Sequence, residues 1–527
     1  MHRALLTLLG LLPLAAVAVE VTVPREGDLS VTVYRAPDRS AGQMELDDLN
    51  GFALVTETRT VTVPEGDNRI RFEGVAGGIE PASAIITGLP GILLEKNRDA
   101  RLLSPSQLVA AALGRSVMLV RTNPKTGRVK RLPARIRSDA GDGVVFETSE
   151  GVEALRCSGL PETFGFLTKS DLSSTPTLSA RVHSPNAATA KVTLSYLARG
   201  FDWMANYVAT LAPDEKSMSL GAWITLGNSN GTTFPSARTQ IVAGRINHDT
   251  DEVEPLDLGS PIFARCWPLG NTTDHLAKQL EQIIVTGMRK DARMAPPPPM
   301  AMAIVAAKLV QQEELGDLKL YRVPDRTTLK SRQIKQVRLL DRQDIPVELF
   351  YGADLPANES VPSRSAQRTI RTRNDAAHHL GLPLPSGSVA SFLANENATL
   401  LLDETPLHDT ALNEEIELVV GSSTDVQVRA VMEKTTAYTR PPFLRGVVRY
   451  KSSLVDDVSR VEIHNADSVD IQFELRLQLP DGTQLIGADA PLSARDGRPL
   501  FKLLIPANRT VTVHYQTEHI SNRPTRK

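Results

Sequence analysis

The sequence IQFELRLQL at residues 471–479 decides the fold more clearly than any other stretch of the chain. Every second position carries an apolar residue: Ile471, Phe473, Leu475, Leu477 and Leu479. A period of two places these side chains on one face of an extended strand and the polar residues between them on the other face. The sequence Pro-Asp-Gly follows and is typical of a turn. The stretch therefore predicts a β-strand with one buried face.

The same alternation recurs along most of the chain. Residues 511–515, Val-Thr-Val-His-Tyr, predict the last strand of an immunoglobulin-like sandwich. Near the N-terminus, residues 61–63 and 70–72 alternate on either side of a Pro-Glu-Gly-Asp-Asn turn and predict a β-hairpin. Asn228-Ser229-Asn230-Gly231 predicts a turn with positive φ angles.

Residues 106–113 predict a short helix, and short strands separated by glycine turns follow up to about Gly151. Strands of this length and spacing are typical of a small SH3-like barrel, which we interpret as a structural insert. The aromatic residues Tyr196, Trp203, Tyr207 and Trp223 occupy strand positions and are expected in a core rather than in a ligand site.

The chain of 527 residues is too long for one core, and we expect several domains. The predicted fold is mostly β, with several β-sandwich-like modules, a small SH3-like barrel insert and a short helical and Pro-rich linker. The expected boundaries are a signal peptide at 1–18, an N-terminal β region at 19–104, the small barrel at 105–160, a β-sandwich-like domain at 161–267, the helix and Pro-rich linker at 268–316, and a C-terminal immunoglobulin-like β region at 317–527.

Several short stretches carry a family resemblance: residues 194–196, 201–203, 207, 223–226, 228–231, 321–324, 333–335 and 348–351. Together they resemble the bacterial secreted proteins grouped as domain of unknown function 4139. The resemblance covers most of residues 20–520 and implies a secreted, mostly β protein of several sandwich-like modules. It implies no activity and no catalytic residue.

The N-terminus has the pattern of a secretory signal peptide. A basic start at Met1-His2-Arg3 precedes a Leu-rich apolar run, and Ala16-Val17-Ala18 supplies the small residues of a cleavage site. The run is too short for a membrane span, which takes about 20 residues. We therefore expect an exported protein, periplasmic or extracellular, that starts at Val19 and does not span a membrane. The formal net charge of −2 makes nucleic acid a poor candidate partner.

Two cysteines, Cys157 and Cys266, are present in the whole chain. In an oxidising compartment a single pair predicts a disulfide bond. Two unrelated buried thiols are the alternative. No CxxC motif is present that could tune a thiolate for redox chemistry.

Motifs for catalysis or metal binding are missing from the sequence. The histidines form no HExxH motif, and no GxSxG elbow, P-loop or dinucleotide fingerprint occurs. His378 and His379 follow Asp375 and form the best local cluster, but we expect no metal there because adjacent strand residues point apart. Ser386 is expected in a turn, and the acidic run 249–252 in a solvated loop. We predict no cofactor.

One short segment, residues 281–287, resembles the TonB box of outer-membrane receptors. Such a segment adds as an extended strand to the edge of a partner's sheet. Ile283, Ile284, Val285 and Thr286 are the candidate partner-binding residues, and four prolines at 296–299 follow in a predicted exposed linker. An ordinary edge strand or helix end is the alternative.

The expected function is that of an exported, non-catalytic β-rich binding or scaffolding protein of the bacterial cell envelope. Two alternatives stay open. The first is a secreted hydrolase whose site assembles from scattered residues. The second is a TonB-linked envelope component that docks through residues 281–287.

Overall fold

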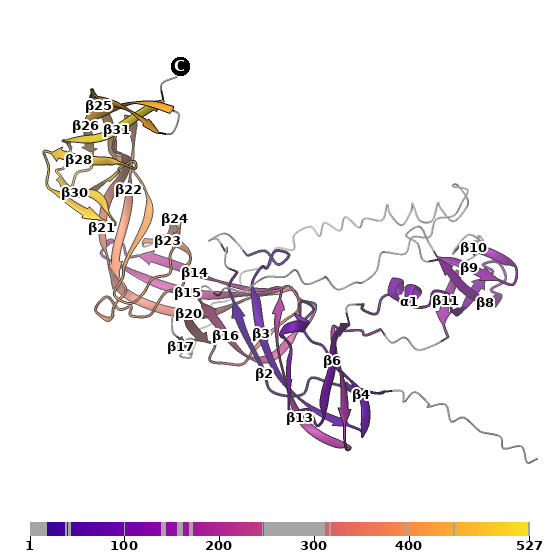
Figure 1. Ribbon diagram of the computed structural model, residues 1–527. Coiled ribbons are helices and arrows are strands. Elements are labelled where there is room, and N and C mark those ends of the chain that lie inside the picture. The colour runs from indigo at the N-terminus through magenta and orange to yellow at the C-terminus, as the bar shows by residue number, and fades with distance from the viewer. Residues whose placement is uncertain are drawn as a thin grey trace, which may run out of the picture. The chain divides into compact units, whose positions relative to one another are not determined.

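The computed structural model describes residues 18–36, 39, 44–99, 101–138, 144–154, 162–167, 172–244, 246, 311–315, 318–395, 398–445 and 448–524. β-Strands dominate these residues, whereas helix is confined among them to α1 (Pro105–Ala111) and the 3₁₀ turns η1 (Pro81–Ser83) and η2 (Ala376–His378) (Figure 1). The prediction of a mostly β fold is confirmed. No helix within these ranges has the length and apolar character needed to cross a membrane.

Several predictions concern residues outside this description. The leader at residues 1–17, Cys157 and Cys266 all lie outside it. So does the stretch 247–310, which contains the acidic run, the candidate docking residues Ile283–Thr286 and the four prolines. The signal peptide, the disulfide bond and the docking segment therefore stay predictions.

The chain divides into two compact units. The first comprises Met1–Pro37, Met44–Trp203 and Leu226–Lys335, and the second comprises Asp38–Gln43, Met204–Thr225 and Gln336–Lys527. Residues 204–225 thus belong with the C-terminal part of the chain, although the sequence places them inside the range 161–267.

Two sheets form the main body of the first unit. The four-stranded sheet has the order β1 (Val19–Val23), β4 (Gly66–Glu73), β12 (Thr177–Ser184) and β6 (Ile92–Asp99). The eight-stranded sheet has the order β17 (Gln311–Leu315), β18 (Leu318–Arg322), β16 (Phe234–Ala243), β2 (Leu29–Tyr34), β3 (Phe52–Val63), β13 (Ala188–Arg199) and β5 (Ile85–Thr87), with β19 (Thr327–Leu329) beside β16. Both sheets combine strands from the N-terminal region with strands that follow residue 172.

The predicted hairpin at residues 61–72 is wrong, although its burial pattern is right. Val61, Val63, Ile70 and Phe72 are all buried. However, β3 pairs with β2 and β13, whereas β4 pairs with β1 and β12. The turn between them therefore joins two different sheets. These sheets are in contact there: the guanidinium of Arg59 on β3 lies 5.7 Å from the ring centroid of Phe72 on β4. Alternating burial looks the same in a hairpin and in such a connection.

The turn at residues 228–231 also differs from its prediction, because none of its four residues has a positive φ angle. Asparagine side chains shape it instead. Asn228 Oδ1 accepts a hydrogen bond from the Asn230 backbone N–H at 3.1 Å. Asn230 Oδ1 accepts one from the Gly78 N–H at 2.8 Å, and its Nδ2 donates to the Arg199 carbonyl at 2.9 Å. Asparagine favours turns either by adopting a positive φ angle or by hydrogen bonding from its side chain to the backbone, and this turn uses the side-chain hydrogen bonds.

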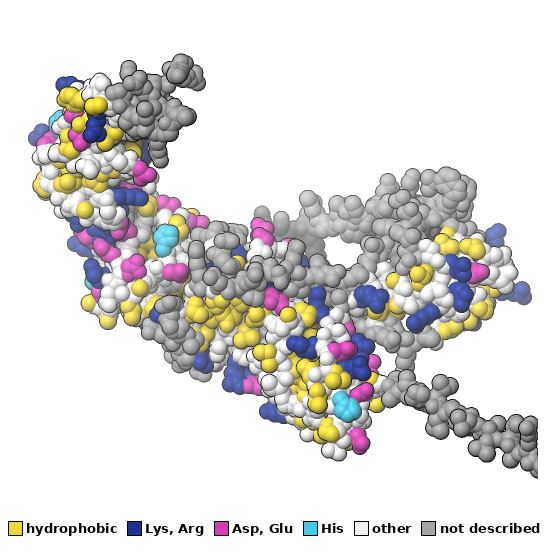
Figure 2. Space-filling model, in the orientation of Figure 1, with side chains coloured by type: hydrophobic (Ala, Val, Ile, Leu, Met, Phe, Trp, Pro, Cys, Tyr) yellow, Lys and Arg dark blue, Asp and Glu magenta, His cyan; other side chains and the backbone are white. Residues whose placement is uncertain are grey.

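A small module in the first unit contains α1 and five strands. Ser104 caps the helix by accepting a hydrogen bond from the Gln107 N–H, 3.0 Å away. The strands form an antiparallel sheet around their own apolar core, as predicted for an SH3-like barrel. Their order is β10 (Gly151–Ala154), β9 (Val145–Thr148), β8 (Val129–Ser138), β7 (Ser116–Thr122) and β11 (Glu162–Phe166). Figure 2 shows basic side chains, in dark blue, spread over this module.

The second unit contains two further sheets. The five-stranded one has the order β20 (Gln333–Pro346), β15 (Ser217–Asn228), β14 (Phe201–Leu211), β23 (Gly387–Asn395) and β24 (Ala398–Leu407), in which β14 and β23 are parallel. The nine-stranded one has the order β28 (Thr483–Ala488), β31 (Arg509–Pro524), β26 (Val448–Asn465), β25 (Glu415–Arg445), β22 (Val361–Arg373), β21 (Glu348–Pro356), β27 (Ile471–Gln478), β30 (Arg498–Ile505) and β29 (Leu492–Arg495).

The nine-stranded sheet curves around a single core. Phe473, Leu475 and Leu477 of β27 are buried there as predicted, together with Phe501 of β30 and Tyr515 of β31. An immunoglobulin-like sandwich has two separate sheets, whereas these strands are hydrogen-bonded in one sheet through the parallel pair of β21 with β27. The resulting body is a nearly closed barrel. The candidate site lies on the face of the sheet opposite this core.

Candidate functional site

The strand with the most regular alternation contains a buried acid on its polar face. Glu474 lies in β27 between the core residues Phe473 and Leu475, and its side chain is only 6 % exposed. Register places it beside Gly352 of β21 and Lys502 of β30. Burying a carboxylate costs free energy unless it is paired and hydrogen-bonded. We therefore expect cations beside Glu474 on this face of the sheet.

Arg371 of β22 is the main partner of this acid. Its Nη2 lies 2.8 Å from Glu474 Oε2 and 2.6 Å from Glu417 Oε1 of β25. Its Nε lies 3.0 Å from Glu415 Oε1, and its Nη1 lies 3.8 Å from Glu348 Oε2. The guanidinium also covers the ring of a phenylalanine in β21, Phe350, at 4.2 Å from the ring centroid.

Three further cations complete what we call the ionic cluster. Arg476 Nη2 lies 2.9 Å from both Glu417 Oε1 and Glu474 Oε2. Arg495 of β29 reaches Glu417 Oε1 at 3.0 Å, and Lys502 Nζ lies 3.6 Å from Glu474 Oε1. The cluster consists of Arg371, Arg476, Arg495, Lys502, Glu348, Glu415, Glu417 and Glu474, so four cations face four carboxylates.

The cluster fixes the charge of its central members. Burial alone would raise the pKa of Glu474, but hydrogen bonds from Arg371 and Arg476 outweigh it and lower the pKa to about 2. Burial would likewise lower the pKa of Arg371, and the hydrogen bonds to Glu474 and Glu417 raise it above its ordinary value instead. Both groups are therefore fully ionised across the physiological range.

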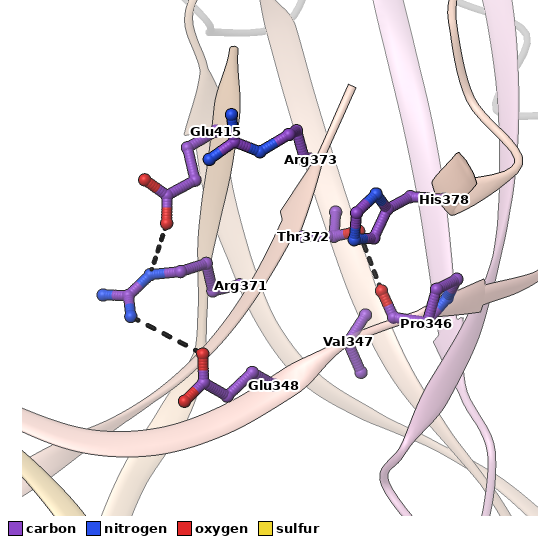
Figure 3. A pocket seen from close by; sticks show the side chains of 8 residues that line it. All are labelled: Pro346, Val347, Glu348, Arg371, Thr372, Arg373, His378 and Glu415. Carbon is purple, nitrogen blue, oxygen red and sulfur yellow. Dashed lines mark hydrogen bonds and ion pairs between the residues drawn. The ribbon is translucent and has the colours of Figure 1, made fainter. Parts of the chain in front are cut away.

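A small pocket opens beside Arg371, with a volume of about 290 Å³. Figure 3 shows the ion pairs of Arg371 with Glu348 and Glu415 on one side of it and the ring of His378 on the other. Its lining consists of Pro346, Val347, Glu348, Arg371, Thr372, Arg373, His378 and Glu415. Because Arg371 and Glu415 belong to the ionic cluster, its ion pairs form part of the pocket wall.

A larger groove of about 660 Å³ also has Glu415 in its lining. The end of β24 and the start of β25 line one part of it, and β29 and β30 line the rest. Leu407, Ile416 and Leu500 are buried beneath it. Lys502 and Asp496 are exposed at it, with side chains 62 % and 88 % exposed. The groove thus has a mainly polar lining, with charged groups of both signs, above these buried apolar residues.

The sequence analysis placed His378 and His379 on a strand, which is wrong: His378 ends the 3₁₀ turn η2, and His379 follows it as the C-cap residue. Asp375 caps the 3₁₀ turn η2, and its Oδ1 lies 2.7 Å from His378 Nδ1. The hydrogen bond with His378 lowers the pKa of Asp375 below its ordinary value. His379 adopts a left-handed conformation with φ at 60°. Among the described residues, no group of three or more His, Cys, Asp or Glu side chains is placed to hold a metal ion.

Three of the four aromatic residues expected in a core are there: Tyr196, Trp203 and Tyr207 are fully buried. Trp223 is only half-buried, so its prediction is not met. Ser386 lies in the bend directly before β23, where its backbone N–H donates to Asp409 Oδ1 at 2.7 Å.

The ionic cluster itself was not predicted from the sequence. Its signal is nevertheless present, since charged residues stand two apart on three strands: Arg371 and Arg373, Glu415 and Glu417, and Glu474 and Arg476. Such pairs share one face of a strand. A solvated sheet face gives the same pattern, so only the assembled sheet shows that these faces meet. Comparisons of the chain with protein-family models and with curated proteins found no match.

Proposed function

We propose that this chain is an exported, non-catalytic binding or scaffolding protein of the bacterial cell envelope, and that the larger groove receives an extended segment of a partner protein. One observation supports it most: a charge-balanced ionic cluster holds the strands beside an open groove that is lined with charged groups of both signs. The leader at residues 1–18 supports export. The resemblance to domain of unknown function 4139 is proposed as family membership and implies no catalytic role.

The protonation chemistry of the cluster favours binding over catalysis. A general acid or base works best when its pKa is close to the operating pH. With a pKa of about 2, Glu474 stays ionised and is a weak base. Arg371 keeps its proton, and its guanidinium forms ion pairs with the carboxylates of Glu474, Glu417, Glu415 and Glu348. These groups are therefore suited to fixing the positions of β22, β25 and β27.

The groove has features that suit an extended polypeptide. The exposed Lys502 and Asp496 can pair with groups of either charge sign. β29 is the terminal strand of its sheet and pairs with β30 alone in the described chain. The free edge of such a strand can add an extended backbone.

Site-specific photocrosslinking in cells of the source bacterium tests the proposal. A photoreactive residue replaces Ala494, which is exposed in the groove. The matched control carries it at Thr512, an exposed residue of β31 that does not line the groove. We expect a discrete adduct with an envelope protein from position 494 alone.

A second variant checks that the groove itself makes the contact. Ser493→Trp fills the groove from an exposed position and should abolish the adduct while the thermal unfolding of the protein is unchanged. Equal adducts from both positions, or none from position 494, would overturn the proposal. Hydrolytic turnover that disappears in Glu415→Gln would instead favour a secreted hydrolase.

A further inference from the structure

The small module carries a long stretch of sequence without an acidic residue. Residues 101–138 contain nine basic residues and no Asp or Glu: Arg101, Arg115, Arg121, Lys125, Arg128, Lys130, Arg131, Arg135 and Arg137. The whole chain has a net charge of −2. The positive charge is therefore a local feature of the module rather than a property of the protein.

The structure separates the paired cations of this module from the unpaired ones. Buried Arg121 reaches Glu153 at 2.5 Å and Glu162 at 2.6 Å. On the surface, Lys130 lies 2.6 Å from Glu150, and Arg137 lies 3.3 Å from Glu147. These four acids are all that the described part of the module (104–138, 144–154 and 162–166) contains, and each is engaged by one of these three cations.

Of the six other cations, Arg101 lies before the described part of the module. The five within it are exposed, and none of them forms an ion pair with another described residue: Arg115, Lys125, Arg128, Arg131 and Arg135. We call them the basic face. Arg131 and Arg135 are exposed on β8, while Ala134 and Ile136 between and beside them are buried in the core. Ser116, which directly follows Arg115, pairs with Arg135 across β7 and β8. Lys125 and Arg128 lie in the turn that joins these two strands. One hairpin therefore carries the entire basic face.

Apolar residues accompany the basic face, but aromatic ones do not. Val129 is 50 % exposed beside Arg128, and Leu113 is 48 % exposed two residues before Arg115. The module's phenylalanines, Phe146, Phe164 and Phe166, belong to its core or pack against it. Single-stranded nucleic acid is usually bound by stacking bases on exposed aromatic rings, which the described part of this face does not offer.

We propose that the basic face is a docking surface for an anionic lipid membrane. Phosphate headgroups match guanidinium geometry, and each Lys or Arg close to an anionic bilayer contributes on the order of 1 kcal/mol to binding. The exposed Val129 and Leu113 can enter the headgroup region beside the arginines. This surface is distinct from the groove in the second unit, so membrane docking can hold or fail independently of the proposed partner binding.

Co-sedimentation of the full chain with lipid vesicles tests the inference. Vesicles of phosphatidylcholine with phosphatidylglycerol should bind the protein, and vesicles of phosphatidylcholine alone should not. Binding should fall steeply as salt is added, because exposed charges are screened. The triple variant Arg128→Gln, Arg131→Gln, Arg135→Gln should reduce partitioning roughly tenfold or more.

Two controls make the result specific. The triple variant Lys216→Gln, Arg429→Gln, Lys434→Gln removes the same number of charges from exposed sites in the second unit and should bind as the unchanged protein does. Replacing Arg128, Arg131 and Arg135 by lysine keeps the charge and should keep most of the binding. Equal losses in both glutamine variants would overturn the proposal, as would tighter binding to duplex DNA or RNA than to anionic vesicles.

Discussion

Replacing Glu474 by glutamine tests whether the ionic cluster stabilises the second unit. Glutamine keeps the shape of the side chain but leaves Arg371 and Arg476 without their most buried counter-charge. The pKa of Glu474 is lowered from 4.5 to about 2. That difference corresponds to on the order of 3 kcal/mol, at about 1.4 kcal/mol per pKa unit. The same order follows from breaking a buried ion pair.

Urea unfolding of the full chain, combined with hydrogen exchange of the β27 amides, measures this loss where it occurs. The matched control is Glu348→Gln, which removes a carboxylate from the same Arg371 at 3.8 Å but from a side chain that is 64 % exposed. An exposed pair of this kind contributes about 1 kcal/mol or less. Equal effects of the two substitutions on the β27 amides would refute the reasoning.

The dependence of this effect on pH has a defined sign. The folded-state pKa of Glu474 is depressed, so its contribution is fully present above about 4.5 and is lost as the pH falls towards 2. Glutamine does not titrate. The stability difference between the unchanged protein and Glu474→Gln should therefore shrink as the pH is lowered through this window, and a difference that stays constant there would contradict the assignment.

Three further substitutions or measurements follow from the structure. Ser104→Ala removes the cap of α1 and should destabilise the small module by about 1 kcal/mol in thermal unfolding, whereas Ser106→Ala should cost less. Asn230→Ala leaves the Gly78 N–H and the Arg199 carbonyl without their partner and should cost about 1–3 kcal/mol in urea unfolding; an unchanged midpoint would show that the turn holds without it. Thiol labelling of denatured, unreduced protein should find Cys157 and Cys266 blocked, and labelling of both would exclude the predicted disulfide bond.

The sequence predicts which residues form strands, but not which strands become neighbours. The alternation at 471–479 correctly identified the core face of β27, because burial follows directly from the period of two. The hairpin at 61–72 failed because the same period is compatible with a connection between two packed sheets. Sheet partners depend on residues far away in the sequence, as in the pairing of β4 with β12.

The candidate site escaped prediction for a related reason. Glu474 has the sequence context of a solvent-facing residue, and only the approach of β22 and β25 makes it buried. Likewise, Asn228 and Asn230 predict a turn, but the hydrogen bonds that shape it reach Gly78 and Arg199 in other parts of the chain. The sequence therefore predicts the features that depend on neighbouring residues. Contacts between residues far apart in the chain decide which side chains are buried and how the turn is held.

The parallel pairing of β14 with β23 has a consequence for synthesis on the ribosome. Residues 205–211 pair with residues 387–393, so β14 emerges long before its partner has been translated. Since translation proceeds at about 5–20 residues per second, this strand must wait on the order of ten seconds or more with an unpaired edge. A strand in that state is prone to aggregation. A fragment that starts at Gln336 would therefore lack β14 and β15, the two strands of the five-stranded sheet that lie between β20 and β23.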